Sequence, residues 1–204
     1  MRKDLTTGLI AIVLMTVTLG LLYPLAITGI SQLVFPGQAD GSLVKVDSRV
    51  VGSSLIGQEF MGEAYFHSRP SATGYSGNVT FFGNAGPNSA EAREEVREQV
   101  KAYLRREKPF DKSLTSAGIP VDAVTQSASG VDPHISVANA RIQAHRVATI
   151  RGLPLSQVED LIPSHTDGRS LGLLGEPGVN VLELNLVLDE VAPVHPRNSS
   201  GSGR

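Results

Sequence analysis

The sequence predicts an α+β protein with a single N-terminal transmembrane helix followed by one mixed α/β extracytoplasmic domain. The 35 residues from Leu5 to Ala39 carry no charge, and about 20 apolar residues already suffice for a helix to cross a bilayer. Beyond this stretch, segments with the apolar spacing of amphipathic helices alternate with shorter strand-like segments. We therefore predict an anchor at residues 1–35 (span about 8–31), a domain at residues 36–192 and a disordered tail at residues 193–204.

The residues before the apolar stretch predict its orientation in the membrane. Arg2 and Lys3 precede it directly, and positively charged residues next to a span tend to stay on the cytoplasmic side. We therefore expect a single-pass protein of the bacterial inner membrane, with its N-terminus in the cytoplasm and its main domain outside. A cleaved signal peptide is the alternative, although its apolar region is typically only about 7–15 residues long.

Several residues of the span suit packing against another membrane helix. Thr16 and Gly20 form a pair of small residues that allows two helix backbones to approach closely. Pro24 lacks an amide hydrogen and is expected to kink the helix, and neighbouring helices often satisfy the carbonyl group that this frees. We expect Gly20, Tyr23 and Pro24 to contact a partner, and plain anchoring is the alternative.

The composition of the domain excludes several classes of function. After the anchor the chain has 16 Lys and Arg residues and 19 Asp and Glu residues, hence a net charge of −3. Nucleic acid binding requires a basic surface, so we expect no such partner. The chain has no cysteine, which excludes disulfide bonds and thiolate chemistry.

The first half of the domain predicts one clear helix among strands and loops. After a linker at residues 36–42, residues 43–51 alternate apolar and polar side chains and predict a half-buried strand. Residues 60–72 predict a strand leading into a loop, and Gly and Asn mark residues 73–88 as loop. The apolar residues from about Ser89 to Glu107 recur on one helical face and predict the clearest helix.

The second half predicts two helices and a late strand. Residues 109–135 are expected to be loop with a short extended piece at 119–121. Ser136 as the N-cap and Gly152 as a left-handed stop delimit the second helix. A third, shorter helix follows up to about Ile162, where Pro163 ends it. Residues 179–189 are interpreted as a strand, with a helix as the alternative.

The sequence carries no familiar catalytic motif. It lacks the phosphate-binding P-loop, the nucleophile elbow and the zinc-binding helix motif, and its five histidines show no metal-ligand spacing. Ser129, Asp132 and His134 are the candidate hydrolase residues. A triad draws its members from separate segments, so three residues this close in sequence are poorly placed to form one. We expect neither a catalytic nor a metal site.

The densest polar cluster covers residues 127–136. Gly130 and Asp132 favour tight turns, and Asp132 and His134 are interpreted as holding this loop, with contact to a partner as the alternative. Arg69 suits a bidentate contact with a carboxylate, either within the domain or across an interface. The residues that we expect to contact a partner outside the membrane are Tyr65, Phe66, Arg69, Asp132 and His134.

Short stretches along the chain together resemble the C subunit of the Kdp potassium-transporting P-type ATPase, the KdpC family. In order, they are Tyr23–Gly29, Gly57–Phe60, Tyr65–Ala72, Val124–Ser136, Arg146–Ala148, Arg151–Leu153, Gly168–Arg169 and Leu174–Leu182. The resemblance covers about residues 8–190 in consistent order. The joint pattern is specific, although each stretch alone is weak.

The resemblance implies a non-catalytic accessory subunit of a high-affinity, ATP-driven potassium uptake complex. Its implied partners are an ATP-hydrolysing subunit, a potassium-channel-like subunit and a small single-span subunit, together with membrane lipid. The family is described as a catalytic chaperone that assists assembly and raises the pump's affinity for ATP. ATP association is thus implied by the family alone, and we expect no firmly bound cofactor.

The expected topology bears on how such a subunit would act. ATP is cytoplasmic and the domain is expected outside, so any effect on ATP affinity would act indirectly, through the conformational states of the pump. The alternative function is a signal-anchored extracytoplasmic binding protein or hydrolase that acts alone.

Overall fold

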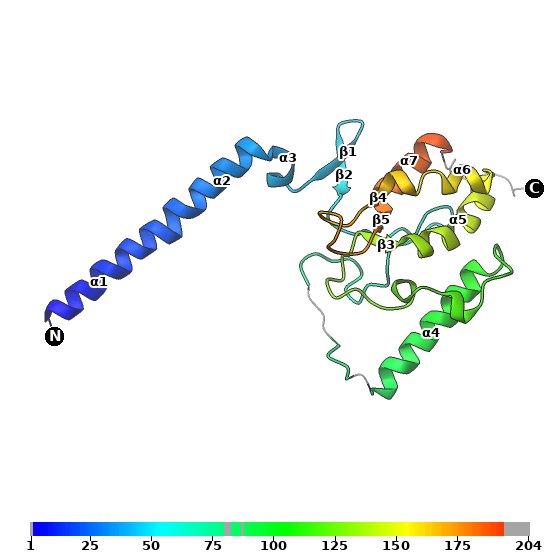
Figure 1. The fold of residues 1–204 in the computed structure, drawn as a ribbon, viewed down its shortest axis with the longest axis horizontal. Coiled ribbons are helices and arrows are strands. Elements are labelled where there is room, and N and C mark those ends of the chain that lie inside the picture. The colour runs from blue at the N-terminus through cyan, green and yellow to red at the C-terminus, as the bar shows by residue number, and fades with distance from the viewer. Residues whose placement is uncertain (1, 80–82, 87, 194–204) are drawn as a thin grey trace, which may run out of the picture. The chain divides into compact units, whose positions relative to one another are not determined.

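The computed structural model describes residues 2–79, 83–86 and 88–193 (Figure 1). It is a mixed α/β structure in which one long apolar N-terminal helix precedes a domain of helices and a small sheet. The predicted fold class is therefore confirmed. The chain divides into two compact units, Met1–Ser53 and Ser54–Arg204. The predicted tail lies almost wholly outside the described residues.

The first unit begins with a helix over Arg2–Val34 that is long and apolar enough to cross a membrane. It consists of α1 (Arg2–Val17), the π-helical turn η1 (Thr18–Leu22) and α2 (Tyr23–Val34). The π turn ends two residues before Pro24, and the Tyr23 amide donates to the Thr18 carbonyl five residues back. A proline ring clashes with the carbonyl four residues before it, and this wider turn is one way to accommodate it within a continuous helix.

A short helix and a hairpin complete the first unit. The predicted linker contains the helical turn α3 (Pro36–Ala39). The single strand predicted at residues 43–51 is wrong, because the chain folds back into antiparallel β1 (Leu43–Val46) and β2 (Arg49–Ser53). Asp47 and Ser48 form the turn, both with positive φ, at 48° and 66°. Two left-handed residues match the twist of a two-residue hairpin.

The second unit packs its helices with a small antiparallel sheet of order β3-β5-β4, whose strands are labelled in Figure 1. The strands are β3 (His134–Ser136), β4 (Thr166–Asp167) and β5 (Gly178–Asn180). The helices are α4 (Ala90–Glu107), α5 (Val137–Arg151), α6 (Leu155–Glu159) and α7 (Val181–Val191). The main apolar core includes Phe66, Ile135, Val147, Val158 and Leu184. A second cluster joins Tyr103 of α4 to Leu114, Ala123 and Val124.

Local capping chemistry explains why two helices lie where the sequence predicts them. The Ser89 and Ser136 hydroxyl groups accept hydrogen bonds from the amides of Ala92 (3.2 Å) and Asn139 (3.1 Å) at the starts of α4 and α5. Gly152 ends α5 in the left-handed conformation, with φ 68°. Helix α6 is shorter than predicted.

Another prediction about the second unit, the late strand at residues 179–189, is wrong beyond Asn180. The late strand ends at Asn180, which caps α7 by accepting a hydrogen bond from the Glu183 amide at 3.2 Å. Val181, Leu184 and Leu188 then recur at helical spacing and are buried, so the helical alternative is the correct one. The extended piece predicted at 119–121 is present at Ile119 and Pro120, whose backbone is extended, and it links two 3-10 turns, Ser116–Gly118 and Val121–Ala123. A third such turn, Pro163–His165, follows α6.

Candidate functional site

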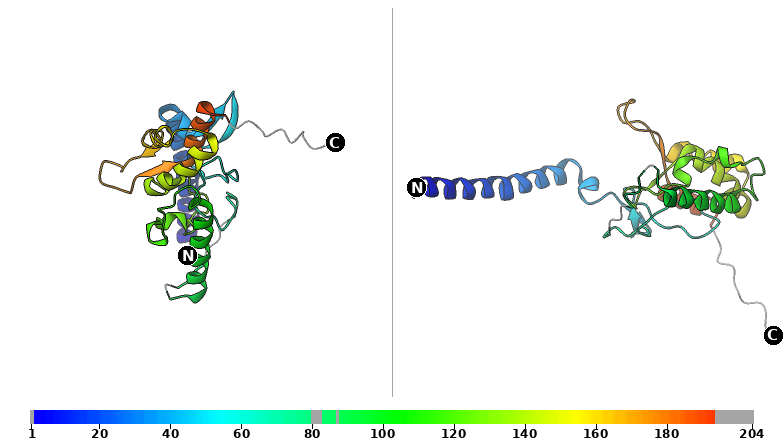
Figure 2. Two further views of the ribbon diagram at one scale, coloured as in Figure 1. Left: turned by 90° about the vertical axis from the view of Figure 1, so that its right-hand side faces the viewer. Right: turned by 90° about the horizontal axis from the view of Figure 1, so that it is seen from below.

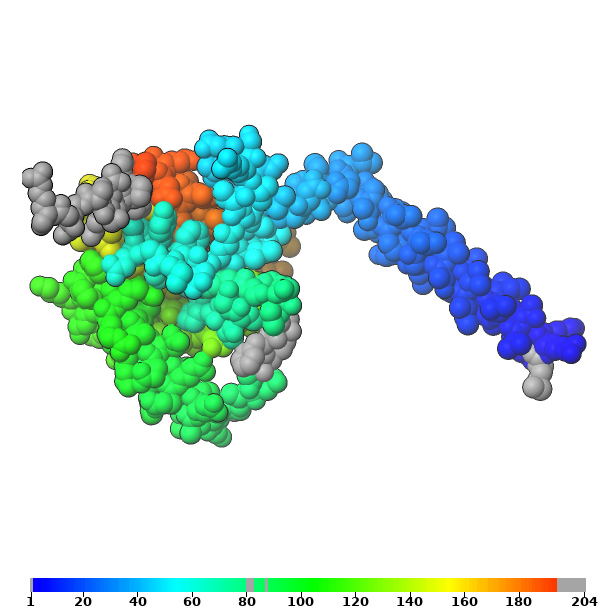
Figure 3. All heavy atoms as spheres, turned by 180° about the vertical axis from the view of Figure 1, so that it is seen from behind, coloured from blue at the N-terminus to red at the C-terminus, as the bar shows by residue number. Residues whose placement is uncertain are grey.

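An irregular segment at residues 63–68 crosses the second unit between α4 and α7 (Figure 3). The strand predicted here is absent because side chains, not a neighbouring strand, bind its backbone. The Asn185 side chain accepts from the Phe66 amide (2.8 Å) and donates to its carbonyl (2.9 Å). Gln143 binds the His67 amide (2.8 Å) and carbonyl (3.0 Å) in the same way. A side-chain amide supplies the same donor and acceptor as a paired strand, so the buried backbone groups are satisfied.

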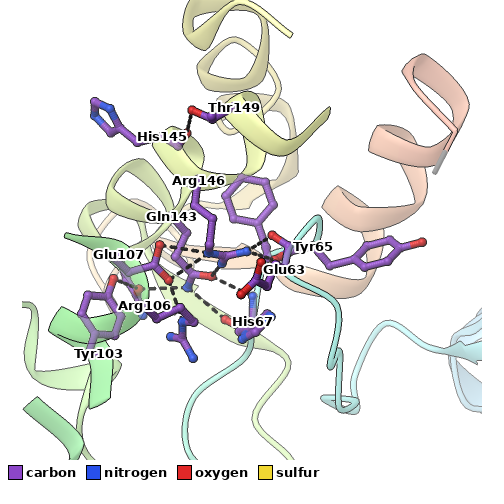
Figure 4. A network of polar contacts seen from close by, with 12 residues as sticks. Glu63, Tyr65, His67, Tyr103, Arg106, Glu107, Gln143, His145, Arg146 and Thr149 are labelled. Atoms are coloured by element: carbon purple, nitrogen blue, oxygen red, sulfur yellow. Dashed lines mark hydrogen bonds and ion pairs between the residues drawn. The ribbon is translucent and has the colours of Figure 1, made fainter. Parts of the chain in front are cut away.

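Arg146 of α5 joins this segment to α4 (Figure 4). Its Nε donates to both Glu107 carboxylate oxygens, at 3.1 and 3.0 Å, and both side chains are fully buried. Its Nη1 donates to the carbonyl groups of Glu63 and Tyr65. Burial lowers the pKa of Arg146, and Glu107 opposes that shift. A buried ion pair with these further hydrogen bonds holds the segment against two helices.

A cavity of about 320 Å³ lies beside this network. Glu59, His67, Tyr75 and Arg106 are among the polar residues of its lining, and Tyr103 also lines it. The Arg106 Nε donates to Glu107 at 2.7 Å, and its guanidinium lies 5.3 Å from the centroid of the Tyr103 ring. The cation that lines the cavity is therefore already bound by a carboxylate and an aromatic face.

His67 is held in its neutral form next to this cavity. Burial lowers its pKa to about 4, with Arg106 and Arg146 adding electrostatic repulsion. The His67 Nε2 lies 3.0 Å from the Gly62 carbonyl oxygen, which only accepts hydrogen bonds, so Nε2 carries the proton. The neutral imidazole thus serves as a donor that closes the turn at residues 62–67.

We expect the stability of the domain to fall as the pH decreases from about 6.5 to 4. The folded pKa of His67 is about 4, below the unfolded value, so its contribution is fully present above about pH 6.5 and is lost as pH falls through the folded pKa. The loss would be at most about 3 kcal/mol. Thermal unfolding of the detergent-solubilised chain should show a smaller loss for His67→Gln, whose amide also donates. An identical pH dependence in the variant would contradict this.

Arg69, Asp132 and His134, which the sequence singles out, lie together. The Arg69 Nη1 contacts the Asp132 Oδ2 at 3.0 Å, and the two side chains are 25% and 26% exposed. The Asp132 Oδ1 accepts a hydrogen bond from the His134 amide at 3.0 Å. Arg69 also donates to Thr125 and to the Gln126 carbonyl. Of the two alternatives for Arg69, the structure thus shows a contact within the domain, made to a single carboxylate oxygen and not bidentate.

The loop at residues 127–133 is positioned by close contact with the backbone of an earlier segment. The Gly57 amide donates to the Val131 carbonyl at 2.7 Å, and a Cβ atom at Gly57 would lie 2.3 Å from the Asp132 carbonyl oxygen. Only glycine permits this distance. Gly130 has φ 71° and accepts a hydrogen bond from the Ser71 hydroxyl at 2.6 Å. The loop at 127–133 is therefore held by segments from well before it in the chain.

Two further sets of polar contacts lie beside these networks, and each includes a more exposed carboxylate, Asp167 or Asp189. The His134 Nε2 lies 2.8 Å from the exposed carboxylate of Asp167. The Tyr65 hydroxyl donates to Asp189 at 3.1 Å, and Arg151 contacts the same carboxylate at 2.9 Å. The Arg151 guanidinium also lies 4.8 Å from the centroid of the Tyr65 ring. Burial raises the pKa of Tyr65, and Asp189 raises it further.

The structure separates the predicted contact residues into three groups. Tyr65, Arg69, Asp132 and His134 are partly exposed and engaged within the domain. Phe66 is fully buried in the core, so its inclusion as a contact residue is corrected: a partner cannot touch a side chain that the domain itself covers. Gly20, Tyr23 and Pro24 are exposed on the long helix, and their contact with a partner stays a prediction.

Sequence reasoning missed the residues that organise the network, namely Gln143, Arg146 and Asn185. Each is buried on the apolar face of its helix, among residues such as Ala144 or Leu184. A large polar residue at a core position of a helix is the signal that would have found them, because such a group requires hydrogen-bond partners when buried.

The arrangement does not combine the candidate hydrolase residues into a triad. Asp132 binds Arg69 and the His134 amide, whereas the Ser129 hydroxyl accepts from the Val131 amide at 3.2 Å. Across residues 2–79, 83–86 and 88–193, no group of three or more His, Asp and Glu side chains could hold a metal ion. The polar contacts described above bind backbone segments and loops to one another.

These features define a class of protein: a membrane protein with one candidate N-terminal span and an α+β domain whose buried polar residues maintain its own fold. Residues 5–190 match the family described as "KdpC: K+-transporting ATPase, c chain". The chain therefore belongs to the KdpC family, and the resemblance found in the sequence is confirmed.

Relatives from three bacteria match over nearly their whole length. The chain is 48% identical to the potassium-transporting ATPase KdpC subunit of Myxococcus xanthus, over 100% of this chain and 95% of that protein. It is 47% identical to that of Mycobacterium tuberculosis strain H37Rv, over 94% and 100% respectively. It is 44% identical to that of Koribacter versatilis, over 95% and 98%. The chain is thus similar to these subunits along nearly its whole length.

Proposed function

We propose that this chain is a non-catalytic accessory subunit that assists assembly of an ATP-driven potassium uptake complex and raises its affinity for ATP indirectly. Its partners would be an ATP-hydrolysing subunit, a potassium-channel-like subunit and a small single-span subunit. The observation that carries the proposal is the family match over residues 5–190, which includes both the membrane helix and the domain.

The charge distribution around the helix supports an orientation with the domain outside. Arg2 and Lys3 lie at one end of the apolar helix, and such residues favour the cytoplasmic side. The N-terminus would then be cytoplasmic and the domain at residues 36–192 extracytoplasmic. With ATP on the other side of the membrane, the domain would have no direct contact with nucleotide.

The membrane helix offers a route for coupling to the other subunits. Thr16 and Gly20 provide a small-residue face, and the π turn at Thr18–Leu22 begins on the same part of the helix. π turns are frequent at functional sites. We propose that Gly20, Tyr23 and Pro24 pack against a membrane helix of the complex at this point.

Indirect action sets a quantitative requirement. A subunit changes the ATP affinity of another only by binding one conformational state more tightly than the other. Coupling energies of about 1–3 kcal/mol correspond to roughly 5–150-fold changes in affinity. Linkage is reciprocal, so ATP would tighten the binding of this chain to the complex by the same factor.

The test uses two preparations from membranes of potassium-starved cells: one captured by a tag on this chain, and one from cells that lack this chain, captured by a tag on another subunit. We expect co-elution of a potassium-stimulated ATPase, and a complex prepared without this chain should need at least about fivefold more ATP for half-maximal activity. Elution of the chain alone, or an unchanged ATP requirement without it, would overturn the proposal. A phosphatase reporter fused after Pro193 should be active only if the domain lies outside.

A further inference from the structure

A hairpin of residues 168–177 projects from the second unit between β4 and β5 (Figure 2, right, brown). Its tip consists of leucines: Leu171, Leu173 and Leu174 are 91%, 81% and 64% exposed. Single exposed leucines are common on protein surfaces, but a cluster at the end of a projection marks a candidate interaction site. We call these three residues the leucine tip.

Backbone hydrogen bonds within the hairpin support the leucine tip. Ser170 and Leu174 exchange amide-to-carbonyl hydrogen bonds in both directions, at 2.8 and 3.0 Å, and the Gly172 amide donates to the Arg169 carbonyl at 3.0 Å. At the base, the Arg169 Nη2 contacts both carboxylate oxygens of Glu176, at 2.8 and 2.9 Å. A loop that is ordered before binding loses less conformational entropy when it binds.

The folding of the domain does not explain why position 171 is a leucine. Leu171 has φ 54°, a left-handed conformation that favours Gly or Asn and is unfavourable for leucine. Its side chain is almost wholly exposed, so it gains no burial in return. A residue that is unfavourable both for the backbone and for solvation points to a role outside the isolated domain.

A lipid bilayer or another protein could cover the leucine tip, and the charges around the hairpin distinguish between them. A cavity of about 680 Å³ adjoins the base, where Gly168 and Pro177 contribute to its lining. The cavity lining and the base of the hairpin together carry four carboxylates and two guanidinium groups, a net charge of −2: Glu159, Asp160, Asp167, Glu176, Arg141 and Arg169. Membrane surfaces attract basic segments through their anionic lipids, so an acidic base disfavours insertion into lipid.

We propose that the leucine tip inserts into an apolar pocket with a positively charged rim on another subunit of the ATPase complex. The tip supplies the apolar anchors, and the net negative charge of the hairpin base and the neighbouring cavity lining complements the basic rim. Interfaces of this kind draw most of their binding energy from a few anchors in well-packed pockets. This inference rests on the proposed role of the chain as a subunit within a complex.

The first experiment places a photoreactive residue, p-benzoyl-phenylalanine, at position 173 of the full-length chain within the assembled complex. We expect irradiation of membranes to crosslink the chain to one other protein subunit. Crosslinking to lipid alone, or to no protein, would overturn this inference if the chain still co-purifies with ATPase activity. Failure of the unmodified chain to co-purify would overturn both this inference and the proposed function.

Matched variants separate docking from folding. Leu171→Asn combined with Leu173→Gln should lower recovery of the other subunits about tenfold or more, because two buried apolar anchors are lost. The thermal midpoint of the solubilised chain should not fall, since Asn tolerates the left-handed conformation. Met61→Gln changes a residue of the same unit that is 82% exposed and should leave recovery unchanged. Equal recovery for the tip variant and the control would overturn the inference.

Discussion

Replacing Arg146 with methionine is expected to destabilise the domain by about 3–5 kcal/mol, the cost of leaving one partner of a buried ion pair without the other. Glu107 is fully buried, and the Glu63 and Tyr65 carbonyl groups also lose their donor. Arg106 still donates to Glu107 at 2.7 Å, so the lower end of the range is expected. Denaturant unfolding followed by circular dichroism measures the change.

Two comparisons test the cause of that loss. Arg141→Met alters an exposed arginine of the same helix and should change the free energy of unfolding by less than about 0.5 kcal/mol. Adding Glu107→Leu to Arg146→Met removes the unpaired buried charge and should recover part of the loss. The recovery should be incomplete because the two carbonyl groups remain unsatisfied. If Arg146→Met were as stable as Arg141→Met, the Arg146–Glu107 ion pair would not be what holds the segment at residues 63–68.

Replacing Asn185 with leucine should cost about 2–6 kcal/mol, because each buried group left unsatisfied costs about 1–3 kcal/mol. Leucine has the same branched arrangement of four side-chain heavy atoms, so the loss would mainly reflect the Phe66 amide and carbonyl, which Asn185 binds at 2.8 and 2.9 Å. Hydrogen exchange gives a local measure: the Phe66 amide should lose its protection while the α5 amides keep theirs.

The control on the same helix is Glu190→Leu, at an exposed position of α7. It introduces the same residue without removing a buried hydrogen bond, so we expect a change within about 0.5 kcal/mol. If Asn185→Leu behaved like Glu190→Leu, or left the exchange of Phe66 unchanged, a side chain would not be substituting for a strand here.

The sequence predicted best where a local chemical signal marks an element. The uncharged stretch from Leu5 predicted the membrane helix, and Ser89, Ser136 and Gly152 marked helix ends through bonds made within a few residues. Prediction failed where the local signal was ambiguous. Residues 181–189 have apolar spacing that fits a strand or a helix, and burial of Leu184 and Leu188 against the core selects the helix.

The candidate site was only partly accessible to such reasoning. Arg69 and Asp132 stood out as polar residues in turn-rich stretches, but their pairing at 3.0 Å joins positions 63 residues apart. The segment at residues 63–68 has strand-like composition, and what keeps it out of a sheet is two amide side chains from α5 and α7. The residue pattern within the segment gives no indication of those distant partners.

The sequence by itself therefore determined the family, the membrane helix, the capped helices and the lack of cysteine chemistry, because each depends on residue type or on neighbours along the chain. Only the tertiary structure decided that Phe66 belongs to the core, that Arg69 binds within the domain, and that the leucine tip stays exposed. Burial and hydrogen-bond partners depend on segments distant in sequence, so physical contact in the folded chain assigns them.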